Sequence, residues 1–449
     1  MSEADSKRAF YRQGSWMVIA TFVSGLLMFA VHIFGGWMRP EEYGLFVTLL
    51  QILNLMMIPA LGLQTVFAQQ TAAAIEPQQR YDLAMSTQKM LLICLCVWGA
   101  ILLLILLKQE AILELLKIEK PTALYVTLLL GLPQLWLPVL LGILQGKQNF
   151  AWLGGAAIVN GLGRFVAVGI IVTLLSGQAA GATTGVLIGL TTACLLAGWH
   201  GRQTWLGQSG ASRGNFNAKA WMARVVPLTL GMGAGLFMLS ADMIAARAIL
   251  PEVDSGPYGA AGMIGRGLVA FTAPLAAVMF PKLVREAAEA KSGVLGQTFL
   301  STTILGVLAG IGCSLAAWLL PDIVDHFSVL ASKKKTLTDI ASLIPYFIWS
   351  MLPLALGNVF VAALLAQERY RAVPWLVAIA IVYGLTLVWL TKTASAPTTL
   401  ESWKGFWHTT DAIPPSPRTI ILTLGGFNLA FLGTAAALAR RYASSPESR

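Results

Sequence analysis

Long apolar blocks recur along the whole chain, separated by short polar stretches. Each block is about 20 residues long, which is the length an α-helix needs to cross about 30 Å of hydrocarbon. The composition agrees, because 56% of the 449 residues are hydrophobic, only 12% are charged and the mean hydropathy is +0.71. Soluble domains carry about 25% charged residues. The pattern therefore predicts an all-α integral membrane protein and excludes an ordinary soluble protein.

The apolar pattern divides into about 12 transmembrane helices. We expect them at 15–36, 43–66, 84–107, 122–144, 151–175, 181–200, 223–249, 258–280, 297–320, 341–366, 372–391 and 418–438. No small-residue cleavage site follows the first block, so it is interpreted as a retained span and not as a cleaved signal peptide. An even number of spans places both termini on the same side of the membrane.

The distribution of basic residues indicates which side that is. If the N-terminus is cytoplasmic, most Lys and Arg residues fall in cytoplasmic segments, and the run Lys333–Lys335 is the main exception. Basic residues are enriched on the cytoplasmic side of membrane proteins. We therefore expect a multi-pass protein with both termini in the cytoplasm.

The net charge of +10, the four cysteines and the four histidines do not point to another class of site. The cysteines lie inside apolar blocks, where they act as small packing residues, and the histidines have no metal-binding motif around them. These residues are Cys94, Cys96, Cys194 and Cys313, and His32, His200, His326 and His408. We expect no metal and no cofactor. No basic domain outside the membrane is available to bind a nucleic acid.

A weak internal repeat suggests two similar halves. One offset of 215 residues relates Tyr43 to Tyr258, Gly44 to Gly259 and Pro59 to Pro274. Many transporters are built from two such halves, although Tyr-Gly turns also recur by chance at membrane interfaces. We expect two six-helix lobes, residues 1–200 and 223–449, joined by a cytoplasmic linker at 201–222.

Several segments together resemble a known family. They are Glu41–Phe46 with Gly62–Val66, Leu144–Phe150, Ser240–Arg247, Gly256–Ala261 and Met279–Lys282. This set is similar to the bacterial polysaccharide and O-antigen flippases of the multidrug/oligosaccharidyl-lipid/polysaccharide exporter superfamily. The resemblance spans most of the chain but does not identify the saccharide.

The resemblance implies an architecture and an activity. The two lobes would surround a central cavity that opens alternately to either side of the bacterial inner membrane. The substrate would be a polyprenyl-diphosphate-linked oligosaccharide, which moves to the outer leaflet while its tail stays in membrane lipid. A polysaccharide polymerase or ligase is a possible partner. The aromatic segment 392–417 is longer than the resemblance implies, and either an amphipathic stretch at the outer interface or a disordered loop accounts for it.

Charged side chains inside the expected helices are rare and therefore informative. Each costs about 2.5–3.5 kcal/mol at the bilayer centre unless it faces water or a partner. Arg164 falls near the middle of the fifth expected helix, beside Gly161 and Gly163. Asp242 and Arg266 lie at similar depth on the adjacent, antiparallel seventh and eighth helices, so these two charges can pair.

Arginine suits a phosphate ligand because its planar fork can donate two hydrogen bonds to one phosphate. We assign Arg164, Arg266 and Arg247 to the substrate diphosphate. Asp242 would hold Arg266 in place or bind a coupling proton or cation. The alternative is that Asp242 and Arg266 serve only packing, that Arg164 caps a polar spot between helices, and that Arg247 reaches the interface along its helix.

Polar residues in apolar surroundings extend the candidate cavity. They are Gln64, Gln134, Asn160, Ser240, Ser350 and Asn358. Such groups can bind sugar hydroxyls, but they also join transmembrane helices to one another.

Three other functions are alternatives to the flippase. A cation-coupled multidrug exporter would use Asp242, whereas the excess of Arg over Asp within the helices favours an anionic substrate. A lipid II flippase of the same fold is a second alternative. A membrane glycosyltransferase or ligase needs acidic or histidine catalytic residues on outer loops, and no such motif is present. We therefore expect a transporter and not an enzyme.

Overall fold

The computed structural model describes residues 3–206, 218–289, 294–326, 333–394 and 415–444. All regular elements in these ranges are helices, and eleven segments among them are long and apolar enough to cross a membrane. A further helix, α10, has 38 residues. The predicted all-α membrane fold with about 12 long helices is therefore confirmed.

The chain divides into two compact units, residues 1–229 and 230–449. The boundary lies within helix α9. Residues 207–217 of the expected linker 201–222 lie outside the described residues, so that linker stays a prediction.

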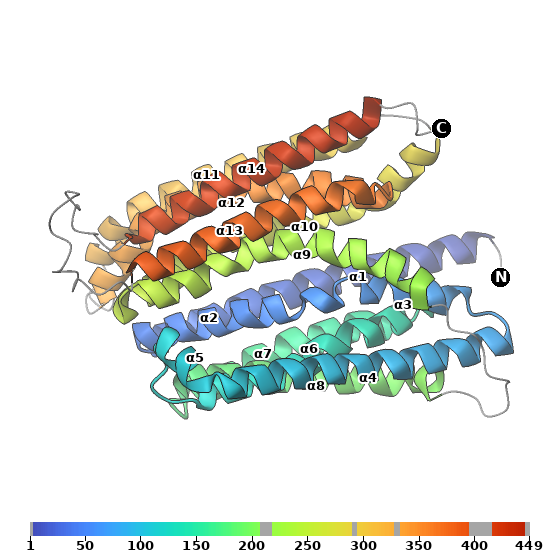
Figure 1. Cartoon of the computed structure of the whole chain (residues 1–449), viewed down its shortest axis with the longest axis horizontal. Helices are drawn as coiled ribbons and strands as arrows, with labels where there is room; N and C mark the ends of the chain where they lie inside the picture. Colours follow the sequence, from blue (N-terminus) through green and yellow to red (C-terminus); the bar gives the residue numbers. More distant parts are fainter. Residues whose placement is uncertain (1–2, 207–217, 290–293, 327–332, 395–414, 445–449) are drawn as a thin grey trace, which may run out of the picture. The chain divides into compact units, whose positions relative to one another are not determined.

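Unit 1 is built around helix α6 (Figure 1). Its elements are α1 (Glu3–Ala30), the 3₁₀ helix η1 (Val31–Trp37), α2 (Pro40–Met56), the 3₁₀ helix η2 (Ile58–Ala60), α3 (Leu63–Ala73), α4 (Pro77–Leu107), α5 (Gln109–Leu115), α6 (Thr122–Gly146), α7 (Phe150–Thr173) and α8 (Gln178–Trp205). Helix α6 packs against α2, α3, α4 and α8, and α7 packs against α1 and α8. Side chains such as Phe67, Leu135 and Val139 form its buried core.

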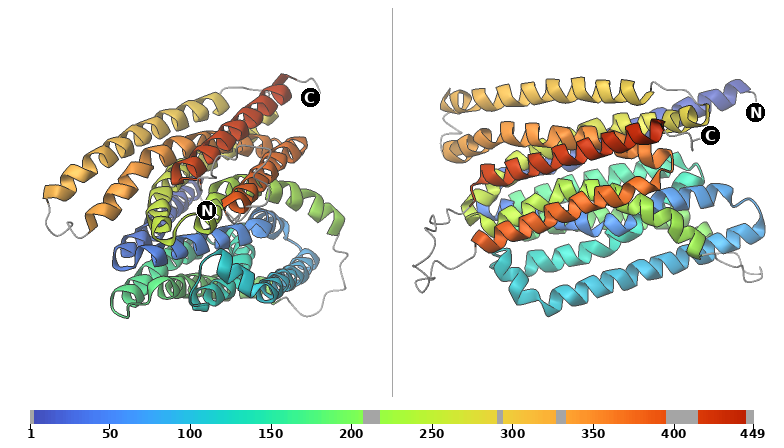
Figure 2. Two further views of the ribbon diagram at one scale, coloured as in Figure 1. Left: turned by 60° about the vertical axis from the view of Figure 1, so that its left-hand side comes forward. Right: turned by 45° about the horizontal axis from the view of Figure 1, so that its top comes forward.

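Unit 2 is built around helix α12. Its elements are α9 (Ala218–Ile249, which begins in unit 1), α10 (Glu252–Glu289), α11 (Val294–His326), α12 (Lys334–Ala366), the 3₁₀ helix η4 (Tyr370–Ala372), α13 (Val373–Ala394) and α14 (Pro417–Ser444). Helix α12 packs against α10, α11 and α14, and it lies between α11 and α14 (Figure 2). Because neighbours cover it on several sides, α12 is largely buried.

Prolines and acidic residues explain several helix ends. Pro40 occupies the first turn of α2 and is followed by Glu41 and Glu42, where proline fits the backbone and carboxylates favour the helix dipole. Glu76 and Gln79 form a capping box at the start of α4. The expected helix 43–66 is wrong as a continuous element, because the chain changes to a 3₁₀ turn beside Pro59 before α3 begins. Proline removes a backbone hydrogen bond from a helix interior.

Other helix boundaries differ from the expected ones. The first helix begins at Glu3 and ends at Ala30, and a 3₁₀ helix completes the segment that was expected to be helical to residue 36. The Lys333–Lys335 run was expected in a loop, but Lys334 and Lys335 begin α12. Helix α5, a short element, was not expected at all. Hydropathy locates the apolar part of a helix and misses polar turns that extend beyond it.

Candidate functional site

The best-defined polar site of unit 2 is an ion pair between α9 and α10. The Arg266 Nη2 atom lies 2.7 Å from Asp242 Oδ1 and 2.8 Å from Asp242 Oδ2. Arg266 Nε donates to the Leu239 carbonyl at 2.9 Å. Asp242 is 0% exposed and Arg266 is 4% exposed. The pairing expected from their similar depth is present, and each charge compensates the other in an apolar setting.

Two residues of α10 lie around this ion pair. Tyr258 on α10 is fully buried, and its hydroxyl donates to Asp242 Oδ2 at 3.0 Å. Gly262 lies one turn before Arg266, and a Cβ atom there would collide with Arg266 Nη1. Glycine at this position therefore leaves room for the guanidinium beside its own helix.

Six buried side-chain atoms of unit 2 lack a hydrogen-bond partner among the described residues, and they include Arg266 Nη1, Ser240 Oγ and Tyr383 Oη. All three are buried. A buried polar atom without a partner costs about 1–3 kcal/mol. Ser240 lies two residues before Asp242, and its hydroxyl is available to bind a ligand.

Arg247 lies near the end of α9 and is only 2% exposed. Its Nη1 atom donates to Ser255 Oγ at 2.7 Å, and its Nη2 atom lies 4.0 Å from Glu252 Oε2. The side chain thus joins α9 to the first turn of α10. These contacts place Arg247 at the junction between α9 and α10.

Arg164 in unit 1 has a different environment. Its Nε atom donates to Asn160 Oδ1 at 2.8 Å, one turn earlier on α7. Its backbone and Cγ atom lie against Gly189 of α8, where a Cβ atom would collide with them. Within the described part of the chain, no carboxylate lies within ion-pair distance of Arg164. Among the described residues, the neutral Asn160 side chain is therefore the hydrogen-bond partner of this guanidinium, whose exposure is intermediate.

The remaining polar candidates divide between the two units. In unit 1, Gln64 Nε2 donates to Gln145 Oε1 at 3.0 Å, and Gln134 Nε2 lies 3.1 Å from Met57 Sδ. In unit 2, the Asn358 amide oxygen lies close to Gly235. These contacts hold neighbouring helices together, and they do not bring the candidates into a single cluster within either unit.

The structure also adds residues that the sequence did not single out as site members. In the sequence, Tyr258 stands out only as part of the repeat, and Tyr383 and Asn428 belong to no motif. Asn428 is 0% exposed, and its Nδ2 atom donates to the Ser350 carbonyl at 2.8 Å. Tyrosine is enriched at membrane interfaces and asparagine can join transmembrane helices, so the sequence alone does not separate these residues from packing residues.

Two basic residues, Lys147 and Arg80, interact at one end of unit 1, and Lys147 lies outside the spanning segments. Lys147 follows the last residue of α6, and Arg80 lies in the first turn of α4. Burial lowers the pKa of Lys147 from its ordinary value of 10.5, and the positive charge of Arg80 lowers it further. Both effects disfavour a charged amine, and an anion bound nearby would oppose them.

A protein-family model described as polysaccharide biosynthesis protein matches residues 10–287. The chain belongs to this family. The match includes Arg164, Asp242 and Arg266, and it covers more than half of the chain. A comparison with curated protein sequences gives no match.

Solved structures show the same fold. An inward-facing multidrug resistance MATE family transporter of the MOP superfamily shares 14% sequence identity, covers 94% of each chain and gives a TM-score of 0.72. A MOP superfamily transporter from Pyrococcus furiosus, in which reverse polarity of the binding pocket suggests a different function, shares 15% identity at a TM-score of 0.55. That comparison covers 98% of this chain and 96% of the other. This family member therefore has the MOP transporter fold and is a multi-pass membrane protein.

Proposed function

We propose that this protein is a flippase that moves a polyprenyl-diphosphate-linked oligosaccharide to the outer leaflet of the bacterial inner membrane. The family supplies a role in polysaccharide biosynthesis, and the fold is that of a transporter. A transporter that acts in polysaccharide biosynthesis would carry a lipid-linked glycan, so we propose this class of substrate. Alternating access of two lobes around a central cavity, with both termini cytoplasmic, is the mechanism we propose for it.

Arg164 is the observation that supports an anionic substrate most strongly. A guanidinium inside a membrane span needs compensation, and the described residues offer it only the neutral Asn160 side chain. A diphosphate would supply the missing negative charge and could accept hydrogen bonds from both terminal nitrogens of the guanidinium. We therefore propose Arg164 as the principal diphosphate ligand.

Arg266 and Arg247 have weaker claims to the same role. Each already contacts a carboxylate, Asp242 for Arg266 and Glu252 for Arg247. Arg266 keeps one unused donor, Nη1, which could bind a phosphate oxygen without breaking the ion pair. We propose Arg266 as a secondary ligand, Asp242 as the group that orients it, and Arg247 as a residue of the helix junction.

The contacts of Asp242 also bear on the alternative of a cation-coupled exporter. Its carboxylate accepts two bonds from Arg266 and one from Tyr258. A cationic drug or a coupling ion would have to compete with that guanidinium. The proposal therefore ranks the anionic lipid above a cationic substrate.

Thermal stabilisation of the purified full-length protein tests the proposal. A ligand at a hundredfold excess over its Kd stabilises a protein by about 2.7 kcal/mol. We expect undecaprenyl-diphosphate oligosaccharide to raise the melting temperature of the wild type, and Arg164→Gln to weaken binding at least about tenfold. Arg202→Gln is the matched control, because Arg202 lies at the end of α8 in the same unit and stacks on Trp199.

Three results would decide between the candidate substrates. A shift with lipid II as large as that with other saccharides would make lipid II an equal substrate. A shift with cationic drugs alone would replace the flippase by the exporter and return attention to Asp242. Normal binding and export by Arg164→Gln would remove Arg164 from the site.

A further inference from the structure

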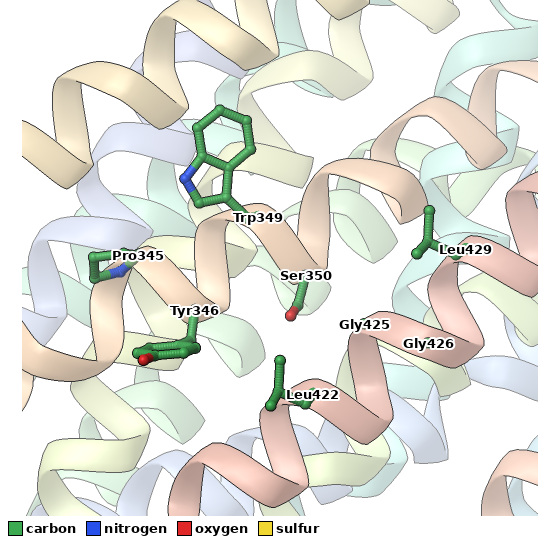
Figure 3. Close-up of a pocket in the computed structure, with 8 residues that line it drawn as sticks. All are labelled: Pro345, Tyr346, Trp349, Ser350, Leu422, Gly425, Gly426 and Leu429. Carbon is green, nitrogen blue, oxygen red and sulfur yellow. The ribbon is translucent and has the colours of Figure 1, made fainter.

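Helices α12 and α14 of unit 2 form an open groove of about 520 Å³, to which the proposed transport assigns no role. Tyr346, Trp349 and Ser350 line it from α12, and Leu422, Gly426 and Leu429 line it from α14 (Figure 3). Its volume falls in the range of about 300–1,000 Å³ that is typical of small-molecule sites. We call this cavity the α12–α14 groove.

The surface of the groove is mostly hydrocarbon. Leu422 and Leu429 are each 59% exposed, and Trp349 is 43% exposed. Gly426 contributes no side chain, and a Cβ atom built there would meet nothing within 4 Å. The absence of a side chain at Gly426 therefore keeps the groove open along α14, and an apolar ligand would fill it.

A positive charge lies at one end of the groove. Arg418 is the second residue of α14, and its Cζ atom lies 5.1 Å from the centre of the Tyr346 ring. Arg418 is exposed, and among the described residues no carboxylate pairs with it. Arginine and aromatic residues are typical of the boundary between hydrocarbon and headgroups. We therefore place the Arg418 end of the groove at the depth of the lipid headgroups.

The length of the groove corresponds to one leaflet. Leu429 is 11 residues beyond Arg418 on the same helix, which is about 16 Å at 1.5 Å per residue. Half of a hydrocarbon core about 30 Å thick is about 15 Å. A chain anchored at Arg418 would thus reach the membrane midplane at the far end of the groove.

We propose that the α12–α14 groove is a binding site for one acyl chain of an anionic phospholipid, with the lipid phosphate against Arg418. The apolar walls bind the chain, and the guanidinium binds the phosphate through charge-assisted hydrogen bonds. A net negative lipid such as phosphatidylglycerol is favoured over zwitterionic phosphatidylcholine, because one interfacial Arg contributes to anionic-lipid affinity. The site is independent of the substrate proposed above.

Two glycines on α14 supply a matched pair of variants. Gly426→Phe would place a ring in the groove, whereas Gly433→Phe places the same ring seven residues later, on the same face but outside the groove. The Cβ positions of both glycines are free of contacts within 4 Å. Both variants should therefore fold, and they differ only in whether the groove is filled.

The experiment measures the number of bound lipids by native mass spectrometry, and the melting temperature, for the full-length protein in detergent. Phosphatidylglycerol should bind and stabilise the wild type and Gly433→Phe, and Gly426→Phe should lose this effect. Arg418→Gln should weaken binding about fivefold, whereas Lys392→Gln, which removes a basic residue at the end of α13, should not. Phosphatidylcholine should bind less well than phosphatidylglycerol.

A fluorescence measurement keeps the proposal testable if Gly426→Phe is poorly expressed. Brominated phosphatidylglycerol chains should quench the wild type more than Trp349→Phe, and Arg418→Gln should reduce the quenching. Equal binding by Gly426→Phe and Gly433→Phe, or equal quenching with and without Trp349, would overturn the proposal. Stabilisation by undecaprenyl phosphate alone, lost in Gly426→Phe, would also overturn it and assign the groove to an isoprenoid chain.

Discussion

The two units surround an arginine within a membrane-spanning helix in opposite ways. In unit 2, Arg266 is held by the Asp242 carboxylate, which Tyr258 also contacts. In unit 1, the guanidinium of Arg164 hydrogen-bonds, among the described residues, to the neutral amide of Asn160. An arginine that is paired with a carboxylate of the protein already has its charge neutralised. An arginine without such a partner is suited to bind a negatively charged ligand. The difference indicates that the charge of Arg266 in unit 2 is neutralised within the protein, whereas the charge of Arg164 in unit 1 is available to an anionic ligand.

The largest expected effect comes from removing the carboxylate of unit 2. Asp242→Asn should lower the free energy of unfolding by about 3–5 kcal/mol, because it leaves Arg266 buried without its counter-charge. Denaturant unfolding of the purified protein in detergent measures this change. Asp339→Asn, at an exposed position on α12, is the control and should change stability by less than about 0.5 kcal/mol.

A double variant tests whether the loss comes from the unpaired charge. Asp242→Leu with Arg266→Met should be more stable than Asp242→Asn, since apolar replacement of a whole buried pair is often neutral or stabilising. A double variant as unstable as the single one would mean that packing, and not charge compensation, explains the site.

The complementary change in unit 1 should affect transport more than folding. Arg164→Gln should reduce export at least about tenfold, while its stability changes by about 1 kcal/mol from the lost bond to Asn160. Arg164→Lys keeps the charge but loses the planar fork, so it should restore export only in part. A polysaccharide export assay at matched expression level measures both variants. If Arg164→Gln unfolded as readily as Asp242→Asn, the contrast between the units would fail.

Two tyrosines provide a finer test within unit 2. Tyr258→Phe removes a hydrogen bond to the Asp242 carboxylate, and bonds to charged groups contribute about 1.5–3 kcal/mol. Tyr383 is equally buried, but its hydroxyl has no partner among the described residues. Tyr383→Phe should therefore be neutral or slightly stabilising under the same unfolding conditions. Equal losses in the two variants would show that the ion pair does not depend on Tyr258.

The smallest expected effect concerns the basic end of unit 1. Arg80→Gln should raise the pKa of Lys147 toward 10.5, because it removes the second cause of the lowered value. A lowered folded-state pKa means that the charged amine is unfavourable in the fold. Its destabilisation is present below the folded pKa and disappears as pH rises through it toward the unfolded value. NMR titration of ¹³C-methylated lysines measures the shift, and an unchanged pKa would exclude Arg80 as a cause.

The sequence determined the fold class, because about 20-residue apolar blocks have few solutions other than membrane-spanning helices. It also located Arg164, Asp242 and Arg266, since charges inside such blocks are rare, and their depth along adjacent helices predicted the ion pair. Sequence periodicity could not locate the break between α2 and α3 or the polar extensions of α1 and α12.

Only the tertiary structure decided how each charge is compensated. Tyr258 on α10 donates a hydrogen bond to Asp242 on the neighbouring α9. Arg247 contacts Glu252 and Ser255 at the junction of the same two helices. The α12–α14 groove likewise depends on which faces of two helices pack together, because the residues that line it from α12 and from α14 are more than 70 positions apart in the chain. Hydropathy depends on each residue by itself, whereas electrostatic compensation and open space depend on the neighbours that folding brings to it.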